Sequence, residues 1–158
     1  MGNIFSGSEV IELGIEIEKN GRDFYNALAT KSKSEDSRAT FLKLATEEEK
    51  HLEAFNGMLE RAGSSDMVES YSDEYSGYMR ALASESIFTR KDKGRQIAAG
   101  VKTEAEAIEL GIGFEKDSIL FYEGMKKAVP EYDHKVIDEL IAQEQSHLRL
   151  LRGLKMGK

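Results

Sequence analysis

The sequence feature that most constrains the fold is an internal repeat. Residues 9–25 and residues 106–122 are identical at ten of 17 aligned positions, at an offset of 97 residues. Downstream, the repeat resumes at an offset of 96, where the segment around Glu48 and His51 matches the segment around Glu144 and His147. A repeat that resumes after a short connection predicts that one helical hairpin occurs twice in the chain.

Helix boundaries can be placed from capping signals. Ser6 with Glu9, and Thr103 with Glu106, have the spacing of a capping box, which marks the start of a helix. Pro130, the only proline, suits the first turn of the last helix. We therefore expect four long helices, over about residues 8–32, 35–62, 104–129 and 130–153.

The two hairpins are separated by about 40 residues. Residues 72–88 favour a short fifth helix, whereas the polar, glycine-containing and locally basic residues 89–103 favour a loop. A connection of this length can run from one end of a bundle to the other. The prediction is an all-α, single-domain four-helix bundle over residues 1–158, with hairpins at about 8–63 and 104–153 and a crossover at about 64–103.

Each long helix has an apolar stripe at helical spacing, and a single glutamate interrupts each stripe. These glutamates are Glu18, Glu48, Glu115 and Glu144. A carboxylate buried among apolar side chains is costly unless it is protonated, paired or bound to a metal. If these faces were instead solvated, the glutamates would need no partner, but the apolar stripes around them would then be unexplained.

Two of the glutamates are followed three residues later by a histidine. Residues three apart share a helix face, so His51 points where Glu48 points, and His147 points where Glu144 points. In the first copy the midpoint between the two glutamates is residue 33, in a polar stretch; in the second it lies next to Pro130. If the hairpins turn there, all four glutamates lie at one level, about 22 Å from the turns.

Four glutamates and two histidines at one level form the ligand set of a dimetal carboxylate site: one Glu from each of two helices and Glu-x-x-His from each of the others. By analogy with such sites, Glu18 and Glu115 are terminal ligands and Glu48 and Glu144 are bridges. His51 and His147 would each supply one nitrogen. Carboxylates and imidazole suit iron, so two iron ions per chain are expected, and manganese accepts the same ligands.

Two tyrosines occupy equivalent positions in the repeat. Tyr25 and Tyr122 lie two turns after Glu18 and Glu115, so their hydroxyls could donate hydrogen bonds to ligand carboxylates on neighbouring helices. Simple core packing is the alternative for either ring. Arg22 lies on the ligand stripe and could pair with a carboxylate.

The composition excludes several kinds of chemistry. The chain has no cysteine, so disulfides, thiol catalysis and cysteine-ligated iron centres are excluded. Its net charge of −7 argues against binding to nucleic acid or to an anionic membrane. The sequence also lacks an apolar run of membrane-spanning length and a recognisable secretion signal, so a cytoplasmic protein is expected. Gly2 and Ser6 fit a myristoylation pattern, and a plain leader is the alternative.

The segments EIEKNGRDFY (16–25) and EKDSILFY (115–122), together with the two Glu-x-x-His helices, resemble the rubrerythrin-like branch of the ferritin-like di-iron proteins. The resemblance covers both hairpins, about 100 of the 158 residues. It implies a ferritin-like bundle and a non-haem di-iron oxidoreductase, often a homodimer, that reduces hydrogen peroxide or reacts with dioxygen. Because the chain has no cysteine, the electrons must come from a separate donor, such as a rubredoxin.

One ligand position departs from this family. Rubrerythrins have an extra glutamate one turn after the ligand on the third long helix, and here that position is Ser118. A peroxidase is the first expectation. A ferroxidase or other iron-handling protein, a dimanganese catalase, and a bundle that binds a partner around a structural metal remain as alternatives.

Overall fold

The computed structural model describes residues 7–62, 72–85 and 89–157, and these residues form helices joined by short connections. The helices are α1 (Gly7–Lys31), α2 (Glu35–Ala62), α3 (Asp73–Glu85), α4 (Lys93–Ala99), α5 (Glu104–Met125) and α6 (Glu131–Met156), with a one-turn 3₁₀ helix, η2 (Lys126–Ala128), between α5 and α6. No described helix is long and apolar enough to span a membrane.

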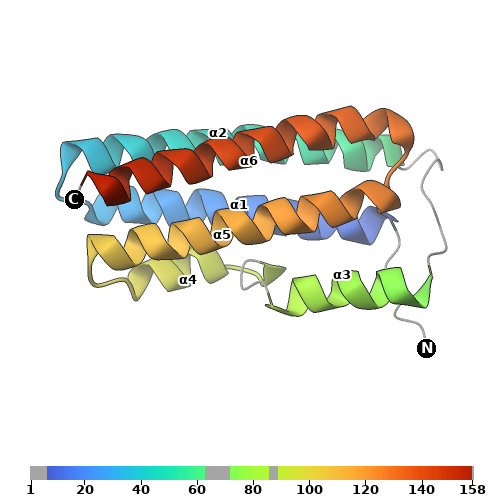
Figure 1. The fold of residues 1–158 in the computed structure, drawn as a ribbon, viewed down its shortest axis with the longest axis horizontal. Helices are drawn as coiled ribbons and strands as arrows, with labels where there is room; N and C mark the ends of the chain where they lie inside the picture. Colours follow the sequence, from blue (N-terminus) through green and yellow to red (C-terminus); the bar gives the residue numbers. More distant parts are fainter. Residues whose placement is uncertain (1–6, 63–71, 86–88, 158) are drawn as a thin grey trace.

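The four long helices form a bundle of two antiparallel hairpins (Figure 1). Helix α1 packs on α2, α5 packs on α6, and contacts between α1 and α5 and between α2 and α6 join the two hairpins. The crossover returns the chain to the end of the bundle where α1 meets α2, so α5 runs antiparallel to α1 (Figure 1). The predicted all-α four-helix bundle with one long crossover is confirmed.

The helix boundaries follow the predicted signals closely. The first hairpin turns at residues 32–34, around the predicted midpoint, and Thr103 caps α5 by accepting a hydrogen bond at 3.1 Å from the Glu106 amide. Ser6 lies outside the described residues. Pro130 is the residue before α6 rather than part of its first turn, because its ψ of 153° is extended and the helix begins at Glu131.

The predicted loop over residues 89–103 is wrong in part, because it contains α4, which packs on α1. Two polar side chains of α1 hold the ends of this short helix. The Asn20 side chain accepts a hydrogen bond from the Gly94 amide at 3.0 Å and donates one to the Arg90 carbonyl at 2.6 Å. At the other end, the Lys31 ammonium donates to the carbonyls of Ala98 and Val101, at 2.9 and 2.5 Å.

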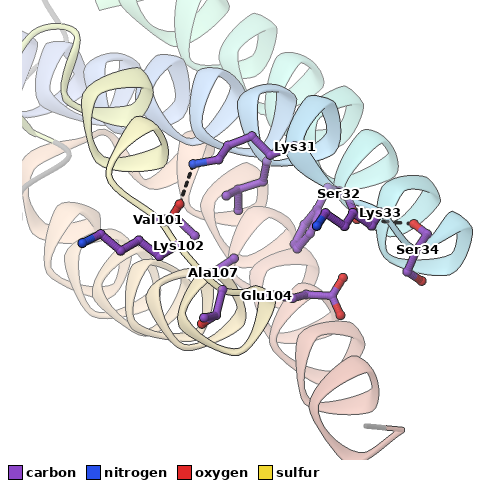
Figure 2. Close-up of a pocket in the computed structure, with 11 residues that line it drawn as sticks. Lys31, Ser32, Lys33, Ser34, Val101, Lys102, Glu104 and Ala107 are labelled. Carbon is purple, nitrogen blue, oxygen red and sulfur yellow. Dashed lines mark hydrogen bonds between the residues drawn. The ribbon is translucent and has the colours of Figure 1, made fainter.

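The bond from Lys31 to Val101 borders a cavity at this end of the bundle (Figure 2). The cavity has a volume of about 360 Å³ and lies where the α1–α2 turn meets the start of α5. Its walls combine apolar side chains such as Leu28 and Phe41 with the polar residues of the two connections. None of the six predicted ligands lines it, so this cavity is separate from the predicted metal site.

The close contact between α4 and α1 depends on a glycine. A Cβ atom at Gly94 would lie 1.9 Å from the backbone oxygen of Asn20, far inside van der Waals contact. We therefore expect Gly94→Ala to displace α4 and to lower the free energy of unfolding by about 1–3 kcal/mol, as overpacking typically does. Denaturant unfolding measures this.

Gly100→Ala is the matched control at the other end of α4. A Cβ atom at Gly100 would lie 3.6 Å from the Ile97 carbonyl oxygen, which is ordinary van der Waals contact. The free energy of unfolding of the Gly100→Ala variant should stay the same or rise slightly. Equal unfolding midpoints for Gly94→Ala and the unmodified protein would contradict the close docking of α4.

Candidate metal centre

The six predicted ligands come together in the middle of the bundle. Helix α1 supplies Glu18, α5 supplies Glu115, and α2 and α6 each supply a Glu-x-x-His pair. All six side chains are buried, with at most 1% of each residue exposed. Such burial follows from the sequence, because each glutamate interrupts an apolar stripe that faces the core.

The six residues form two overlapping groups in which the ligand atoms lie within 4.8 Å of one another. One group consists of Glu18, Glu48, His51 and Glu144, and the other of Glu48, Glu115, Glu144 and His147. Glu48 and Glu144 belong to both groups, whereas each remaining residue belongs to one. This is the geometry expected of two adjacent cation positions that share two carboxylates.

Both histidines turn their Nδ1 atoms towards the carboxylates. Nδ1 of His51 lies 2.7 Å from Glu144 Oε1 and 3.5 Å from Glu18 Oε2. Nδ1 of His147 lies 3.1 Å from Glu48 Oε1 and 3.4 Å from Glu115 Oε1. The two imidazole rings stack nearly parallel, with centroids 5.5 Å apart and planes 11° apart.

Many of these polar atoms are buried without a hydrogen-bond partner in acceptable geometry. Among the described residues, such atoms include both carboxylate oxygens of Glu48 and Glu144 and the Nδ1 atoms of His51 and His147. Unpartnered buried polar atoms are rare in folded proteins and demand an explanation such as a bound ion. Four ionised carboxylates carry the charge that two divalent cations would balance, so the donor set fits two metal ions.

The two predicted tyrosine hydrogen bonds are present, and each crosses between the hairpins. The Tyr25 hydroxyl on α1 donates to Glu115 Oε1 on α5 at 2.8 Å, and the Tyr122 hydroxyl on α5 donates to Glu18 on α1. Aromatic contacts hold both rings. Tyr25 stacks on Phe41 at a centroid distance of 6.2 Å, and Tyr122 packs against Phe55 at 5.1 Å.

Burial and crowding shift the pKa values of the carboxyls. Burial, followed by the charge of Glu144, raises the pKa of Glu48 and of Glu115 well above the usual range. Burial would also raise the pKa of Glu144, but the nearby Glu115 carboxyl and both imidazoles outweigh it and lower that pKa. Protons therefore concentrate on some members of the cluster, as expected for like charges that share one low-dielectric site.

The pKa values of both histidines shift in the direction that favours the charged imidazolium form. Burial alone would lower the pKa of His51, but the carboxylates of Glu18 and Glu144 outweigh it and raise the pKa to about 12. Burial likewise opposes charge on His147, and Glu115 and Glu144 raise its pKa to about 11. Without metal, protons on the imidazoles and carboxyls offset part of the negative charge of the cluster.

Two residues beside the site were not predicted from the sequence. Nε2 of His51 lies 2.6 Å from Gln143 Oε1, and Nε2 of His147 lies 3.0 Å from Glu47 Oε1. Gln143 and Glu47 each directly precede a shared glutamate and are equivalent in the repeat. Their equivalence in the repeat could have singled out these two residues. A contact between two helices, however, cannot be predicted from residue spacing within one helix.

Three other residues lie outside the ligand set. Arg22 pairs with Glu49 at 2.9 Å and with Asp23 at 3.1 Å rather than with a ligand. The third histidine, His134, is half-buried, with Nε2 3.3 Å from the Val129 carbonyl oxygen. Ser118 is buried but donates to the Phe114 carbonyl at 3.0 Å, so it ties back to its own helix.

Comparisons with known proteins agree with this geometry. The family model described as Rubrerythrin matches residues 9–155. A solved structure from Thermotoga maritima, described as a ferritin-like diiron-carboxylate protein, superposes with a TM-score of 0.69. The two chains are 28% identical, and the match covers 99% of this chain and 98% of the other. A search of curated proteins gave no match.

The pKa shifts predict how the metal-free protein responds to pH. Glu48, Glu115, His51 and His147 have raised pKa values, so the folded state binds more protons than the unfolded state between the unfolded and folded values. Stability is then lost as the pH rises through that interval, by about 1.4 kcal/mol per pH unit for each extra bound proton. We expect the melting temperature of metal-free protein to fall between about pH 6 and about pH 9.

Two comparisons isolate the cause of this fall. The lowered pKa of Glu144 affects stability only at acidic pH, so it does not oppose the trend over this range. Bound metal replaces the protons and stabilises the folded state by mass action, so the difference in melting temperature between the metal-bound and metal-free forms should widen with pH. Glu115→Gln should stabilise the metal-free protein at about pH 9, and a flat profile with no such gain would contradict the buried cluster.

Proposed function

Because this chain belongs to the rubrerythrin family, we propose that its buried cluster binds two iron ions and that the protein is a peroxidase. In this proposal it reduces hydrogen peroxide to water with electrons from a separate donor protein. The family model and the structural match support a di-iron carboxylate protein, and the peroxidase reaction is our inference.

The main support for this proposal is the set of buried side-chain oxygen and nitrogen atoms that have no hydrogen-bond partner. With the exception of Ser37 Oγ, every buried side-chain oxygen or nitrogen without a hydrogen-bond partner in the described residues belongs to one of the six ligands. We infer that Glu18 and His51 hold one ion, Glu115 and His147 hold the other, and Glu48 and Glu144 bridge them. The overlap of the two groups supports this assignment.

Two iron ions held there would supply the two electrons that reduce one peroxide molecule. The protein's own residues keep the ligands fixed and the site dry. Tyr25 and Tyr122 each hold one terminal carboxylate through a hydroxyl hydrogen bond. Burial, followed by the nearby Glu115 or Glu18 charge, raises the pKa of these tyrosines well above the usual range. Their hydroxyls therefore stay protonated and remain donors.

A peroxidase of this kind requires a source of electrons. Since the chain contains no cysteine, it cannot carry a rubredoxin-type centre of its own. We propose a separate redox protein, such as a rubredoxin, as the donor. We also infer a homodimer as the working form, on the strength of the family resemblance alone.

Ser118 supports a second candidate function. Its hydroxyl is bonded to the Phe114 carbonyl, so this position adds no carboxylate to the six ligands. Rubrerythrins have a glutamate at this position, and its replacement by serine puts in doubt the carboxylate/histidine ligand exchange proposed for their peroxidase chemistry. A ferroxidase that oxidises Fe(II), or a dimanganese catalase, is the alternative.

Metal-loaded protein separates these functions. A peroxidase consumes hydrogen peroxide only when a reductant is supplied, whereas a catalase evolves dioxygen from peroxide without one. A ferroxidase that stores iron would require a large closed shell, which native mass measurement detects. Peroxide consumption that is independent of reductant, or an iron-filled shell, would contradict the peroxidase assignment.

We expect two metal ions per chain, because two cation positions share the two central carboxylates. Elemental analysis of protein reconstituted anaerobically with Fe(II) measures this ratio. One ion or none per chain would contradict the assignment.

We also expect Glu48→Ala and Glu144→Ala to lose more metal than Glu18→Ala. A bridging carboxylate serves both ions, so its removal should release most of both, whereas Glu18→Ala should weaken mainly one. Glu12→Ala, an exposed change on the same helix as Glu18, controls for the loss of a surface charge. Equal losses for Glu48→Ala and Glu18→Ala would remove the bridging assignment.

A further inference from the structure

The two halves of the site are matched in most respects, and one difference between them lies beside the histidines. Each half has one terminal glutamate that accepts a tyrosine hydrogen bond from the other hairpin, and one histidine that points Nδ1 at the carboxylates. The outer nitrogen of each histidine also contacts a residue of the other hairpin. That residue is Gln143 for His51 and Glu47 for His147.

The geometry fixes which imidazole nitrogen faces the ligand cluster. In both rings, Nδ1 lies within 4 Å of three carboxylates, and Nε2 points away from them towards Oε1 of the partner. An imidazole that ligates a cation through Nδ1 carries its proton on Nε2 and donates it to that oxygen. Glu47 and Gln143 therefore perform the same task, which is to hold the ring and its tautomer.

The two partners differ in charge. A carboxylate that accepts the Nε2 proton strengthens the imidazole as an electron donor, and such a bond is about twice as strong as one between neutral groups. An amide oxygen orients the ring but adds no charge. The exchange of one for the other changes the chemistry of one histidine and leaves the shape of the site intact.

We propose that Glu47 makes the two metal positions unequal, so that the position ligated by His147 binds its ion more tightly than the position ligated by His51. This rests on the proposed function, since it requires a site for two ions. Outer partners of metal-bound histidines typically change metal affinity about 10- to 100-fold.

Two observations bear on the size of the effect. The Gln143 contact is shorter, 2.6 Å against 3.0 Å, which favours His51. The Glu47 side chain is 25% exposed, so water screens part of its charge. A difference of 0.4 Å alters a neutral bond modestly, whereas a full negative charge acts on both the ring and the cation. We therefore expect the charge to decide the order, with an effect near 10-fold.

Four proteins test the proposal: the unmodified chain, Glu47→Gln, Gln143→Glu, and the double exchange Glu47→Gln/Gln143→Glu. Each is titrated anaerobically with Co(II), and calorimetry yields the two dissociation constants. Repulsion between the two cations contributes to the ratio of these two dissociation constants to a similar extent in all four proteins. Differences in this ratio between the four proteins therefore report the effect of Glu47 and Gln143.

The ratio of the two constants should be widest in the unmodified chain and in the double exchange. It should narrow about 10-fold in each single variant, because both histidines then have the same kind of partner. Glu47→Gln should narrow it by weakening the tighter position, and Gln143→Glu by strengthening the weaker one. The double exchange retains the net charge of the unmodified chain, so its restored ratio cannot come from charge alone.

Glu53→Gln, an exposed change on the same helix as Glu47, should leave both constants unchanged. A ratio that is the same in all four proteins, or one that widens in Glu47→Gln, would overturn the proposal. The substitutions are isosteric and lie at the edge of the bundle, and the melting temperature of each metal-free variant checks its folding. If the unmodified chain binds fewer than two Co(II) ions, the proposed function itself fails, which is a separate result.

Discussion

Mutual repulsion among four buried carboxylates is the constraint on which this structure depends. Glu18, Glu48, Glu115 and Glu144 lie at one level of an apolar core and are fully buried. Four negative charges cannot share such a place without counter-charge, because burial and mutual repulsion both oppose their ionisation. The protein has two means of balancing them: protons on the carboxyls and imidazoles, or two cations. The second explains why the residue types are those of a metal site.

The duplicated hairpin determines how the site is built. Each hairpin supplies one terminal glutamate and one Glu-x-x-His pair, and the contacts that orient them come from the opposite hairpin. Tyr25 reaches Glu115 and Tyr122 reaches Glu18, while Glu47 and Gln143 reach the histidines across the bundle. Neither hairpin can complete the site alone. The site therefore links the two hairpins through contacts that cross the bundle.

The sequence predicted the features that depend on spacing within a helix. The long helices, both turns and the convergence of the six ligands follow from helical periodicity, capping residues and the repeat. Helix α4 was missed because its seven residues are too few to show a period and its ends are held by Asn20 and Lys31 of another helix. Glu47 and Gln143 were missed for the same reason, because their partners lie on another helix. Contacts between distant helices require the packed structure.

Anomalous diffraction would detect directly whether two cations occupy the carboxylate cluster. Crystals of protein purified without added metal would be measured on both sides of the iron and manganese absorption edges. We expect two anomalous peaks at the cluster, each bonded to one histidine Nδ1, flanked by Glu48 and Glu144, and strong at the iron edge. No peak at the cluster, or a single peak bound by only one of the two ligand groups, would contradict it.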